Sequence, residues 1–434
     1  MSVNQFIRPI TTERDGNLCI GGCDLVELAH KYGTPLYVMD EESVRQICRE
    51  YKSAFATYPN IKMMYASKAL CNLAIARVLD EENFGFDVVS AGEIYTVHKA
   101  GVDMSKVLFN GNNKTRKELE LAIDLKVGRF SVDNFYEAEL LNKVAYEKGV
   151  NVDILLRITP GIECHTHEYI QTGQIDSKFG FDMVQIDSAV ELIESKLKNL
   201  NLKGLHAHIG SQIFELQSYA DEVEVLINEL NRVNQKFNLR LDELNIGGGL
   251  GVKYTEDDTP PSVEDFAKAI AESSGEQNNH LKIYLEPGRS IISTAGITLY
   301  TVGSSKITSE GKKYVAVDGG MADNPRPSMY QAKYTAEVAG VNNNELETVT
   351  IAGRYCESGD ILIEDIELPK LNAGDILCVY NTGAYNYSMA SNYNRVEKPA
   401  MVLVNSAQSD MIVSRESLED LVVRENIPDR LRKL

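Results

Sequence analysis

The chain alternates short apolar, β-branched runs with longer stretches that carry apolar residues at helical spacing. Eight runs start at residues 61, 84, 107, 130, 152, 203, 244 and 283. Between them, Asn134–Tyr146 and Gln217–Phe237 have the periodicity of amphipathic helices. This rhythm predicts a TIM-type (β/α)8 barrel over residues 41–290. A doubly wound open sheet is the competing interpretation, but the count of eight and the span of about 250 residues favour the barrel.

The pattern changes after about residue 290. Alternating runs separated by turn residues follow, and they predict a β-rich domain over residues 291–434. Residues 1–40 also hold strand-like pieces. We expect them to join the β-rich domain, because the barrel count is complete without them. The long intervals between the last barrel runs predict extended loops at the barrel mouth.

Composition narrows the function classes. Lys plus Arg is 44 and Asp plus Glu is 63, so the net charge is −19, which argues against a general nucleic-acid or anionic-membrane binder. The seven cysteines include no C-x-x-C pair, which argues against a disulfide framework or a structural zinc site. We see no signal peptide and no run of about 18 apolar residues, and therefore expect a cytoplasmic protein.

Barrel enzymes carry their chemistry at the carboxyl ends of the strands. Polar and glycine residues at the ends of the runs are Lys68, Asp87, Arg157, His206, His208, Ser211, Gly247, Gly248, Gly249, Glu286, Gly288 and Arg289. A lone lysine is usually a solvated surface charge. At a barrel mouth, however, a partly desolvated Lys68 amine would be a nucleophile toward an aldehyde.

The glycine run and Arg289 follow the seventh and eighth runs, where barrels frequently bind phosphate. A plain tight turn is the alternative for the glycines alone. A phosphate site and a Schiff-base lysine together indicate pyridoxal 5′-phosphate. Glu286 is then placed to pair with the pyridine nitrogen, unless it is an ordinary surface carboxylate. His206 and His208 point to one side of a strand, so one could stack on the ring, or both could be core histidines.

The motifs YASKAL, FDVVSAGE, HAHIGSQ, NIGGGLG and EPGRS occur in this order. Together they resemble the fold-type III pyridoxal-phosphate decarboxylases, which have an alanine-racemase-like barrel and a C-terminal β-domain. NPRPSMY, RYCESGD and NTGAYNYSMASNYN are similar to motifs of the diaminopimelate decarboxylase family within that group. The resemblance implies decarboxylation of meso-2,6-diaminopimelate to L-lysine and CO2, the last step of lysine biosynthesis. The family often has Asn at position 70, where Leu70 stands here, and Asn245 occupies a variable position.

The resemblance also implies residue roles. Lys68 would form the Schiff base, His208 would stack on the cofactor ring and Glu286 would pair with its nitrogen. The other cofactor-binding residues would be Asp87, Arg157, Ser211, Gly247, Gly248, Gly249, Gly288, Arg289 and Tyr385. The substrate-binding residues would be Arg289, Arg326, Tyr330, Glu357 and Tyr385. Whether Asp87 and Arg157 act directly or orient neighbours stays open.

In the family the Cys–Glu pair comes from the neighbouring subunit, so a homodimer with shared active sites is implied. Cys356 is then the candidate acid that protonates the carbon after CO2 leaves, and an inert buried thiol is the alternative. Arg289 and Arg326 suit a distal substrate carboxylate, and Glu357 suits a distal ammonium.

Other functions remain as alternatives. A sister decarboxylase would act on ornithine, arginine, carboxynorspermidine or a carrier-linked glutamyl group, but a distal arginine would repel a lone distal amine. A racemase of this fold would place an arginine where Glu286 stands. A non-enzymatic pyridoxal-phosphate carrier would lack the β-domain. A metal-dependent hydrolase would need more ligands than the pair His165 and His167.

Overall fold

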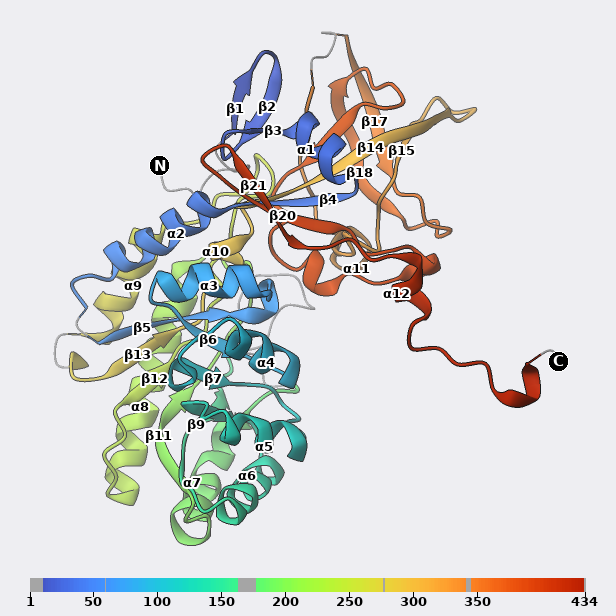
Figure 1. Ribbon diagram of the computed structural model, residues 1–434. Coiled ribbons are helices and arrows are strands. Elements are labelled where there is room, and N and C mark those ends of the chain that lie inside the picture. The colour runs from blue at the N-terminus through green and yellow to red at the C-terminus, as the bar shows by residue number, and fades with distance from the viewer. Residues whose placement is uncertain (1–10, 59, 163–176, 276–277, 341–344, 433–434) are drawn as a thin grey trace. The chain divides into compact units, whose positions relative to one another are not determined.

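The computed structural model describes residues 11–58, 60–162, 177–275, 278–340 and 345–432 (Figure 1). The chain forms two compact units. One, here called the barrel unit, contains Glu42–Thr294. The other, the β unit, joins Arg8–Glu41 with Ala295–Leu434.

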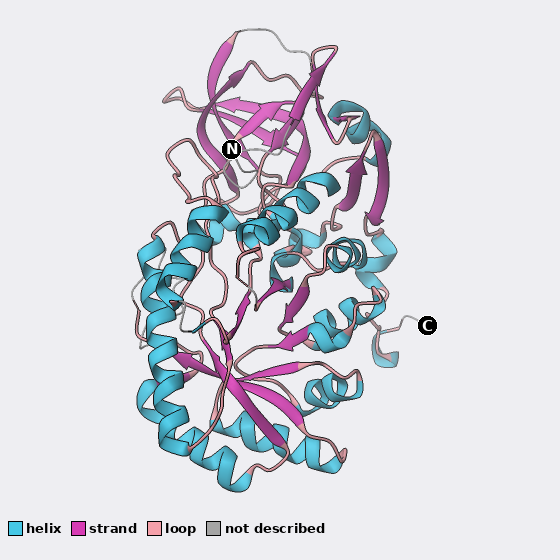
Figure 2. Cartoon of the chain, turned by 90° about the vertical axis from the view of Figure 1, so that its left-hand side faces the viewer, coloured by secondary structure: helices cyan, strands magenta, loops and turns pink. Residues whose placement is uncertain are grey.

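Eight parallel strands form a closed barrel in the barrel unit, and helices surround it (Figure 2). In order around the barrel, the strands are β5 (Ile61–Ala66), β6 (Gly85–Val88), β7 (Val107–Phe109), β8 (Arg129–Val132), β9 (Val152–Thr159), β11 (Leu200–His206), β12 (Glu243–Asn245) and β13 (Lys282–Leu285). The pairing of β13 with β5 and of β8 with β9 completes the ring. A two-residue strand, β10 (Phe181–Asp182), pairs with the carboxyl end of β9.

Several helices of the barrel unit begin with a residue whose side chain caps the helix. The helices of this unit are α2 (Glu41–Ala54), α3 (Leu73–Glu81), α4 (Ala91–Lys99), α5 (Arg116–Asp124), α6 (Phe135–Glu147), α7 (Ile186–Lys196), α8 (Leu216–Phe237), α9 (Val263–Ser274) and α10 (Arg289–Ile292). The side chains that accept an N–H bond at a helix start are Asn72, Ser90, Thr115, Asn134 and Ser262. Four of these caps follow a strand closely, so the chain turns there from strand to helix within a few residues, whereas Ser262 follows a longer loop after β12.

The barrel prediction is confirmed: each of the eight predicted runs is a barrel strand, and both predicted helices exist as α6 and α8. The longer late intervals leave room for extended loops, but in the interval from 203 to 244 the 22-residue helix α8 occupies most of that room. The extra residues of this interval therefore mostly cover the barrel wall and do not extend its mouth.

The β unit contains one large and one small sheet. The main path of the large sheet is β18 (Ile361–Pro369), β17 (Leu346–Ala352), β15 (Lys313–Val317), β14 (Gly296–Ile307), β4 (Leu36–Asp40), β20 (Ala400–Asn405) and β21 (Gln408–Val413). Two further strands, β16 (Ala336–Val338) and β19 (Ile376–Val379), are attached through β14. The small sheet holds β1 (Thr11–Arg14), β2 (Asn17–Ile20) and β3 (Cys23–Asp24).

The N-terminal segment joins this unit, as predicted. β4 pairs antiparallel with β14 and parallel with β20. Helix α1 (Leu25–Tyr32) packs its buried face on the same sheet, and Leu28, Val38, Leu299 and Cys378 belong to one apolar cluster. Burial of these side chains ties residues far apart in the sequence into one core. Within the described ranges, no helix combines the length and apolarity needed to cross a bilayer.

Candidate active site

The Lys68 side chain projects just beyond β5, in a short 3-10 turn over Ser67–Ala69. The turn is braced from the strand, because the Tyr65 hydroxyl donates to the Leu70 carbonyl at 3.0 Å. Ser67 and Ala69 are buried, but Lys68 is exposed. The partial burial expected for this amine is therefore absent from the isolated chain, although the amine remains accessible to a ligand.

Asp87 lies on β6 beside the end of β5, with Ala66 as its register partner. It is only 1% exposed, and its Oδ1 has no hydrogen-bond partner within the described residues. Burial, and next the negative charge of Glu286, raise the pKa of Asp87 well above its usual range, while Lys68 and Arg157 oppose them. A buried oxygen without a partner marks a place where a donor on a bound molecule would fit.

Glu286 follows β13 and is held by two neighbouring strands. Asn245 at the end of β12 donates from Nδ2 to Oε1 at 2.6 Å, and His206 Nε2 lies 3.5 Å from Oε2. Burial by itself would raise the pKa of Glu286, but His206 and the Asn245 hydrogen bond lower it below its usual range. Glu286 thus stays ionised while fully surrounded by protein, as required of a partner for a protonated ring nitrogen.

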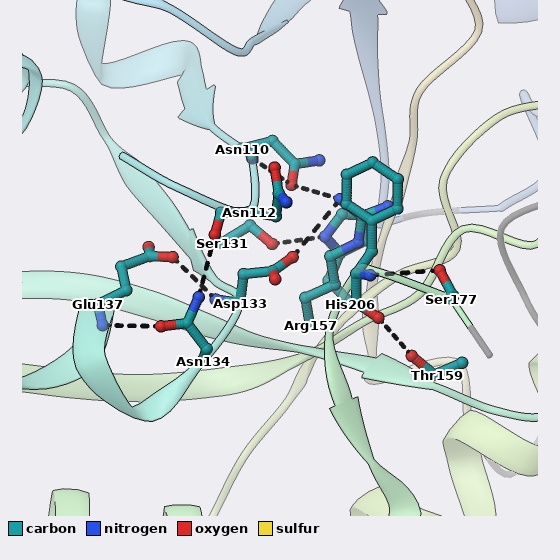
Figure 3. A network of polar contacts seen from close by, with 12 residues as sticks. Asn110, Asn112, Ser131, Asp133, Asn134, Glu137, Arg157, Thr159, Ser177 and His206 are labelled. Carbon is teal, nitrogen blue, oxygen red and sulfur yellow. Dashed lines mark hydrogen bonds and ion pairs between the residues drawn. The ribbon is translucent and has the colours of Figure 1, made fainter. Parts of the chain in front are cut away.

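His206 is fixed from its other side by β8. Its Nδ1 lies 2.6 Å from the Ser131 hydroxyl, and the ring is fully buried (Figure 3). Burial lowers the pKa of His206. His206 therefore lies between the Ser131 hydroxyl and the Glu286 carboxylate.

Arg157 on β9 is the register neighbour of His206 and belongs to the same network (Figure 3). It donates to Asn110 Oδ1 at 3.1 Å, and Asp133 Oδ1 lies 3.9 Å away. Its guanidinium also stacks over the Phe179 ring at 4.3 Å. Arg157 is thus a buried cation held between polar neighbours and an aromatic face, which fits an orienting role.

The glycine run after β12 has almost no room for side chains. A Cβ at Gly248 would lie 2.0 Å from the Glu286 carbonyl oxygen, and one at Gly249 would lie 2.4 Å from the Gly210 carbonyl oxygen. The Gly248 N–H donates to His208 Nδ1 at 3.3 Å, so the loop and the second histidine are neighbours. His208 remains partly accessible, and burial followed by Lys68 lowers its pKa well below the usual range. A neutral ring at the edge of a side-chain-free loop is suited to stacking on a flat ligand.

Arg289 lies beside Ser211, although 78 residues separate them in the sequence. Its Nη2 donates to the Ser211 hydroxyl at 3.1 Å, and its Nη1 donates to the Tyr254 hydroxyl at 2.9 Å. Gly288 precedes it, and a Cβ there would lie 2.9 Å from the Ala66 Cβ. A guanidinium, a hydroxyl and small residues together form a suitable anion site.

The described chain fits pyridoxal phosphate on these grounds. An accessible amine, an ionised carboxylate, a crowded glycine loop and a guanidinium–hydroxyl pair all come from the carboxyl ends of barrel strands. The described residues contain no group of three or more His, Cys, Asp or Glu side chains placed to hold a metal ion. His165 and His167 lie outside the described residues.

In the β unit, Arg326 and Tyr330 are the end residues of helix α11 (Arg326–Tyr330). Arg326 is buried and donates to the Tyr334 hydroxyl at 2.7 Å. Tyr385 has a left-handed backbone with φ of 62°. Because a non-glycine residue adopts this conformation at a cost of about 1–3 kcal/mol, it often marks a functional position.

Cys356 and Glu357 are both exposed in the loop between β17 and β18. Cys356 is thus not buried in the single chain, unlike the thiol of the alternative interpretation. The Cys356 N–H donates to Asn394 Oδ1 at 2.8 Å, so the backbone of the loop is held at this point.

Sequence reasoning missed several residues of the barrel network. It considered Asn245 to have no assignable consequence, yet Asn245 holds both Glu286 and the Gly247 N–H. Asn110 and Asp133 directly follow the third and fourth predicted runs and could have been found by applying the strand-end rule there. No sequence signal indicated that Ser131 faces His206, or that Tyr254 faces Arg289.

Comparison with known proteins identifies the class first. Residues 42–293 match the family described as "Pyridoxal-dependent decarboxylase, pyridoxal binding domain". This range corresponds closely to the barrel unit and includes Lys68, Glu286 and Arg289. The class is that of pyridoxal-dependent decarboxylases, and the cofactor is pyridoxal 5′-phosphate.

Relatives over the full length narrow the class. The chain is 47% identical to diaminopimelate decarboxylase of Synechocystis, covering 99% of this chain and 95% of the relative. It is 46% identical to the Bacillus subtilis enzyme, covering 94% of each. The crystal structure of diaminopimelate decarboxylase from M. jannaschii in complex with L-lysine superposes with a TM-score of 0.93 at 35% identity, covering 99% of this chain and 100% of that one. The chain belongs to the diaminopimelate decarboxylase family.

Proposed function

We propose that the chain decarboxylates meso-2,6-diaminopimelate to L-lysine and CO2, the last step of lysine biosynthesis. The observation that carries the proposal is similarity over both units to enzymes of that name. The diaminopimelate decarboxylase from M. jannaschii has been crystallised with L-lysine, the product of the proposed reaction. The barrel unit supports the same assignment through a site that fits pyridoxal phosphate.

In the barrel unit, Lys68 would attach the cofactor and His208 would cover its ring. Ser211, Arg289 and the backbone of the glycine loop would hold its phosphate. When bound, the cofactor accepts the electron pair released as CO2 leaves the substrate. Glu286 would hold a proton at the ring nitrogen, because its own charge is maintained by Asn245 and His206. Asp87 would bind the cofactor through its buried Oδ1, which has no partner within the described residues, and Arg157 would orient the groups around it.

In the β unit, Arg326, Tyr330, Glu357 and Tyr385 would bind the substrate. A guanidinium can bind the distal carboxylate that distinguishes diaminopimelate from ornithine or lysine. Cys356 would donate the proton that replaces the lost carboxylate, since its thiol is accessible in the chain.

We also propose a homodimer in which the partner supplies Cys356 and Glu357. Their exposure in the single chain supports this arrangement, because both are available to a second copy. A cytoplasmic location is a further proposal. It is supported by the free thiols of the described cysteines, which suit a reducing compartment.

The first test is an assay of the purified, cofactor-loaded protein with meso-diaminopimelate, measuring lysine and CO2. An absorbance band near ~420 nm that borohydride removes reports the covalently held cofactor. Lys68→Ala should abolish the band and reduce kcat by at least about 1,000-fold. Lys62→Ala, at an exposed lysine near the start of the same strand, is the control and should change neither. A band with release of an amine other than lysine would favour a sister decarboxylase, and no band would contradict the cofactor assignment.

The shared site has its own test. Mixing inactive Lys68→Ala with inactive Cys356→Ala should restore activity if the two residues serve one site from different subunits, because a heterodimer then contains one intact site. If mixing under subunit exchange restores nothing, the site is not shared in this way.

A further inference from the structure

One buried carboxylate in the β unit binds two loops that carry proposed substrate residues. Asp360 is 3% exposed and precedes β18. Its Oδ1 accepts from the Met321 N–H at 2.6 Å, and its Oδ2 accepts from the Tyr355 N–H at 2.8 Å. Met321 lies five residues before Arg326, and Tyr355 directly precedes Cys356. One side chain therefore links the turn that leads to Arg326 with the loop that carries Cys356 and Glu357.

The backbone of Asp360 closes the same loop. Its N–H donates to the Glu357 carbonyl at 3.1 Å, and its carbonyl accepts from the Gly353 N–H at 2.9 Å. The loop and the turn also meet directly, because the Arg354 N–H donates to the Gly319 carbonyl at 2.9 Å. On α11, the Ser328 hydroxyl donates to the Gly359 carbonyl at 2.8 Å. The two segments thus form one hydrogen-bonded body.

Two glycines show how closely the carboxylate is enclosed. A Cβ at Gly320 would lie 2.4 Å from Asp360 Oδ1, and a Cβ at Gly353 would lie 2.2 Å from Oδ2. Both distances are far below van der Waals contact, so only hydrogen fits there. The Asp360 carboxylate therefore fits between the turn before Arg326 and the loop of Cys356 only because glycines stand at positions 320 and 353.

A second side chain holds the loop from another segment. Asn394 has a left-handed backbone with φ of 50°, and its Oδ1 accepts from the Cys356 N–H at 2.8 Å. The N–H groups of two consecutive residues, Tyr355 and Cys356, are therefore bound by two different side chains. The direction of the loop just before its thiol is set by these bonds.

We propose that Asp360, assisted by Asn394, is a positioning residue for the decarboxylation. It holds the loop of Cys356 and Glu357 in a defined place relative to the turn that leads to Arg326. This inference rests on the proposed function for the roles of Cys356, Glu357 and Arg326. The link itself consists of described hydrogen bonds within one unit.

The test compares Asp360→Asn with Asp375→Asn in the cofactor-loaded enzyme. Asp375 is the matched control, because it also accepts a backbone N–H (Asn372, 2.7 Å) in a turn of the β unit. In Asp360→Asn an NH2 group faces an N–H donor, so one charge-assisted bond is lost. We expect kcat/KM to fall about tenfold or more, with a lower kcat and a higher KM, and Asp375→Asn to stay within about twofold.

Thiol alkylation distinguishes positioning from general loosening. Cys356 is exposed, whereas Cys378 on β19 is fully buried in the same unit and reports its unfolding. In Asp360→Asn, iodoacetamide should modify Cys356 at a changed rate while Cys378 stays protected, as read by peptide mass spectrometry. Equal acceleration at both thiols, or no difference from Asp375→Asn in both kinetics and labelling, would overturn the proposal.

If Asp360→Asn does not fold, Asn394→Gly replaces it. Glycine accepts the positive φ and removes only the side-chain acceptor. It should reduce kcat about three- to tenfold, with altered Cys356 labelling and unaltered Cys378 labelling. Unchanged kinetics and labelling would again contradict the proposal. Since labelling needs no substrate, failure of the wild-type enzyme to use diaminopimelate would reject the proposed function separately.

Discussion

The two units hold their buried acidic groups in different ways. In the barrel unit, Glu137 pairs with the Lys114 ammonium at 2.7 Å, and Glu286 faces His206 and Asn245. In the β unit, Asp323 accepts from the Tyr300 hydroxyl at 2.5 Å and from the Gly320 N–H at 2.9 Å. Asp360 accepts only backbone N–H bonds within the described residues, and neither β-unit carboxylate forms an ion pair there.

The difference shows that burial alone does not decide the charge of a carboxylate. The pKa of Glu286 is lowered although burial opposes this, whereas burial raises the pKa of Asp323 to about 7 despite its hydrogen bonds. Around Glu286, the two histidines and the Asn245 hydrogen bond outweigh desolvation, whereas around Asp323 the hydrogen bonds from Tyr300 and Gly320 do not. Glu286 in the barrel unit therefore keeps its charge, whereas Asp323 and Asp360 in the β unit serve as hydrogen-bond acceptors for the backbone.

The largest expected effect comes from removing the cation of a barrel ion pair. Lys114 and Glu137 are 1% and 2% exposed, and Lys114 also donates to the carbonyls of Gly111 and Ser131. Lys114→Met should lower the free energy of unfolding by about 3–5 kcal/mol, because an uncompensated carboxylate stays buried. Urea unfolding followed by circular dichroism measures it.

A surface pair in the same unit is the control for that prediction. Lys148 pairs with Asp124 at 2.5 Å, with side chains 27% and 60% exposed. Lys148→Met should cost less than about 1 kcal/mol. If Lys114→Met and Lys148→Met lower the free energy of unfolding by similar amounts, burial of the Lys114 pair does not account for its contribution to stability.

A smaller effect is expected at Glu286, the barrel carboxylate that we propose pairs with the cofactor. Glu286→Gln keeps the shape and one acceptor but removes the negative charge. We expect kcat to fall about 100-fold, since the charge stabilises the protonated ring. Bound cofactor, measured by absorbance, should stay within about twofold of the wild type, because the phosphate contacts remain. Glu264→Gln, at an exposed position on α9, should leave kcat unchanged. An unchanged kcat in Glu286→Gln would contradict the role of the charge.

The smallest expected effect is a pH dependence of stability caused by Asp323, a buried carboxylate of the β unit. The folded-state pKa of Asp323 is raised from 3.8 to about 7. Its stabilising contribution is therefore complete below the unfolded pKa and is lost as pH rises toward 7. Between pH 5 and pH 7 this loss is about 2 kcal/mol. Asp323→Asn should remove that part of the pH dependence, as measured by unfolding at several pH values, while Asp375→Asn should retain it. A wild-type slope in Asp323→Asn would show that the protonation of Asp323 does not contribute to the pH dependence in this range.

Much of the fold and part of the site followed from the sequence, for a physical reason. Period and length of apolar runs reflect strand and helix geometry directly, so the eight barrel strands could be predicted. In a parallel barrel, strand ends converge on one rim. Lys68, Asp87 and Glu286 could therefore be identified as candidates from their places at the ends of runs, before any distance was known.

Only the tertiary structure decided which of these groups meet. Ser131 and His206 are 75 residues apart, and Asn245 and Glu286 are 41 apart, yet each pair lies at 2.6 Å. Such contacts depend on strand register and on the direction of each side chain. The local periodicity of the sequence predicts neither of these. The same holds for Asp360, which looks like an ordinary loop acid in the sequence. Asp360 becomes a link because two backbone segments fold around its carboxylate. Which N–H groups reach that carboxylate depends on how the whole unit packs, not on the local sequence.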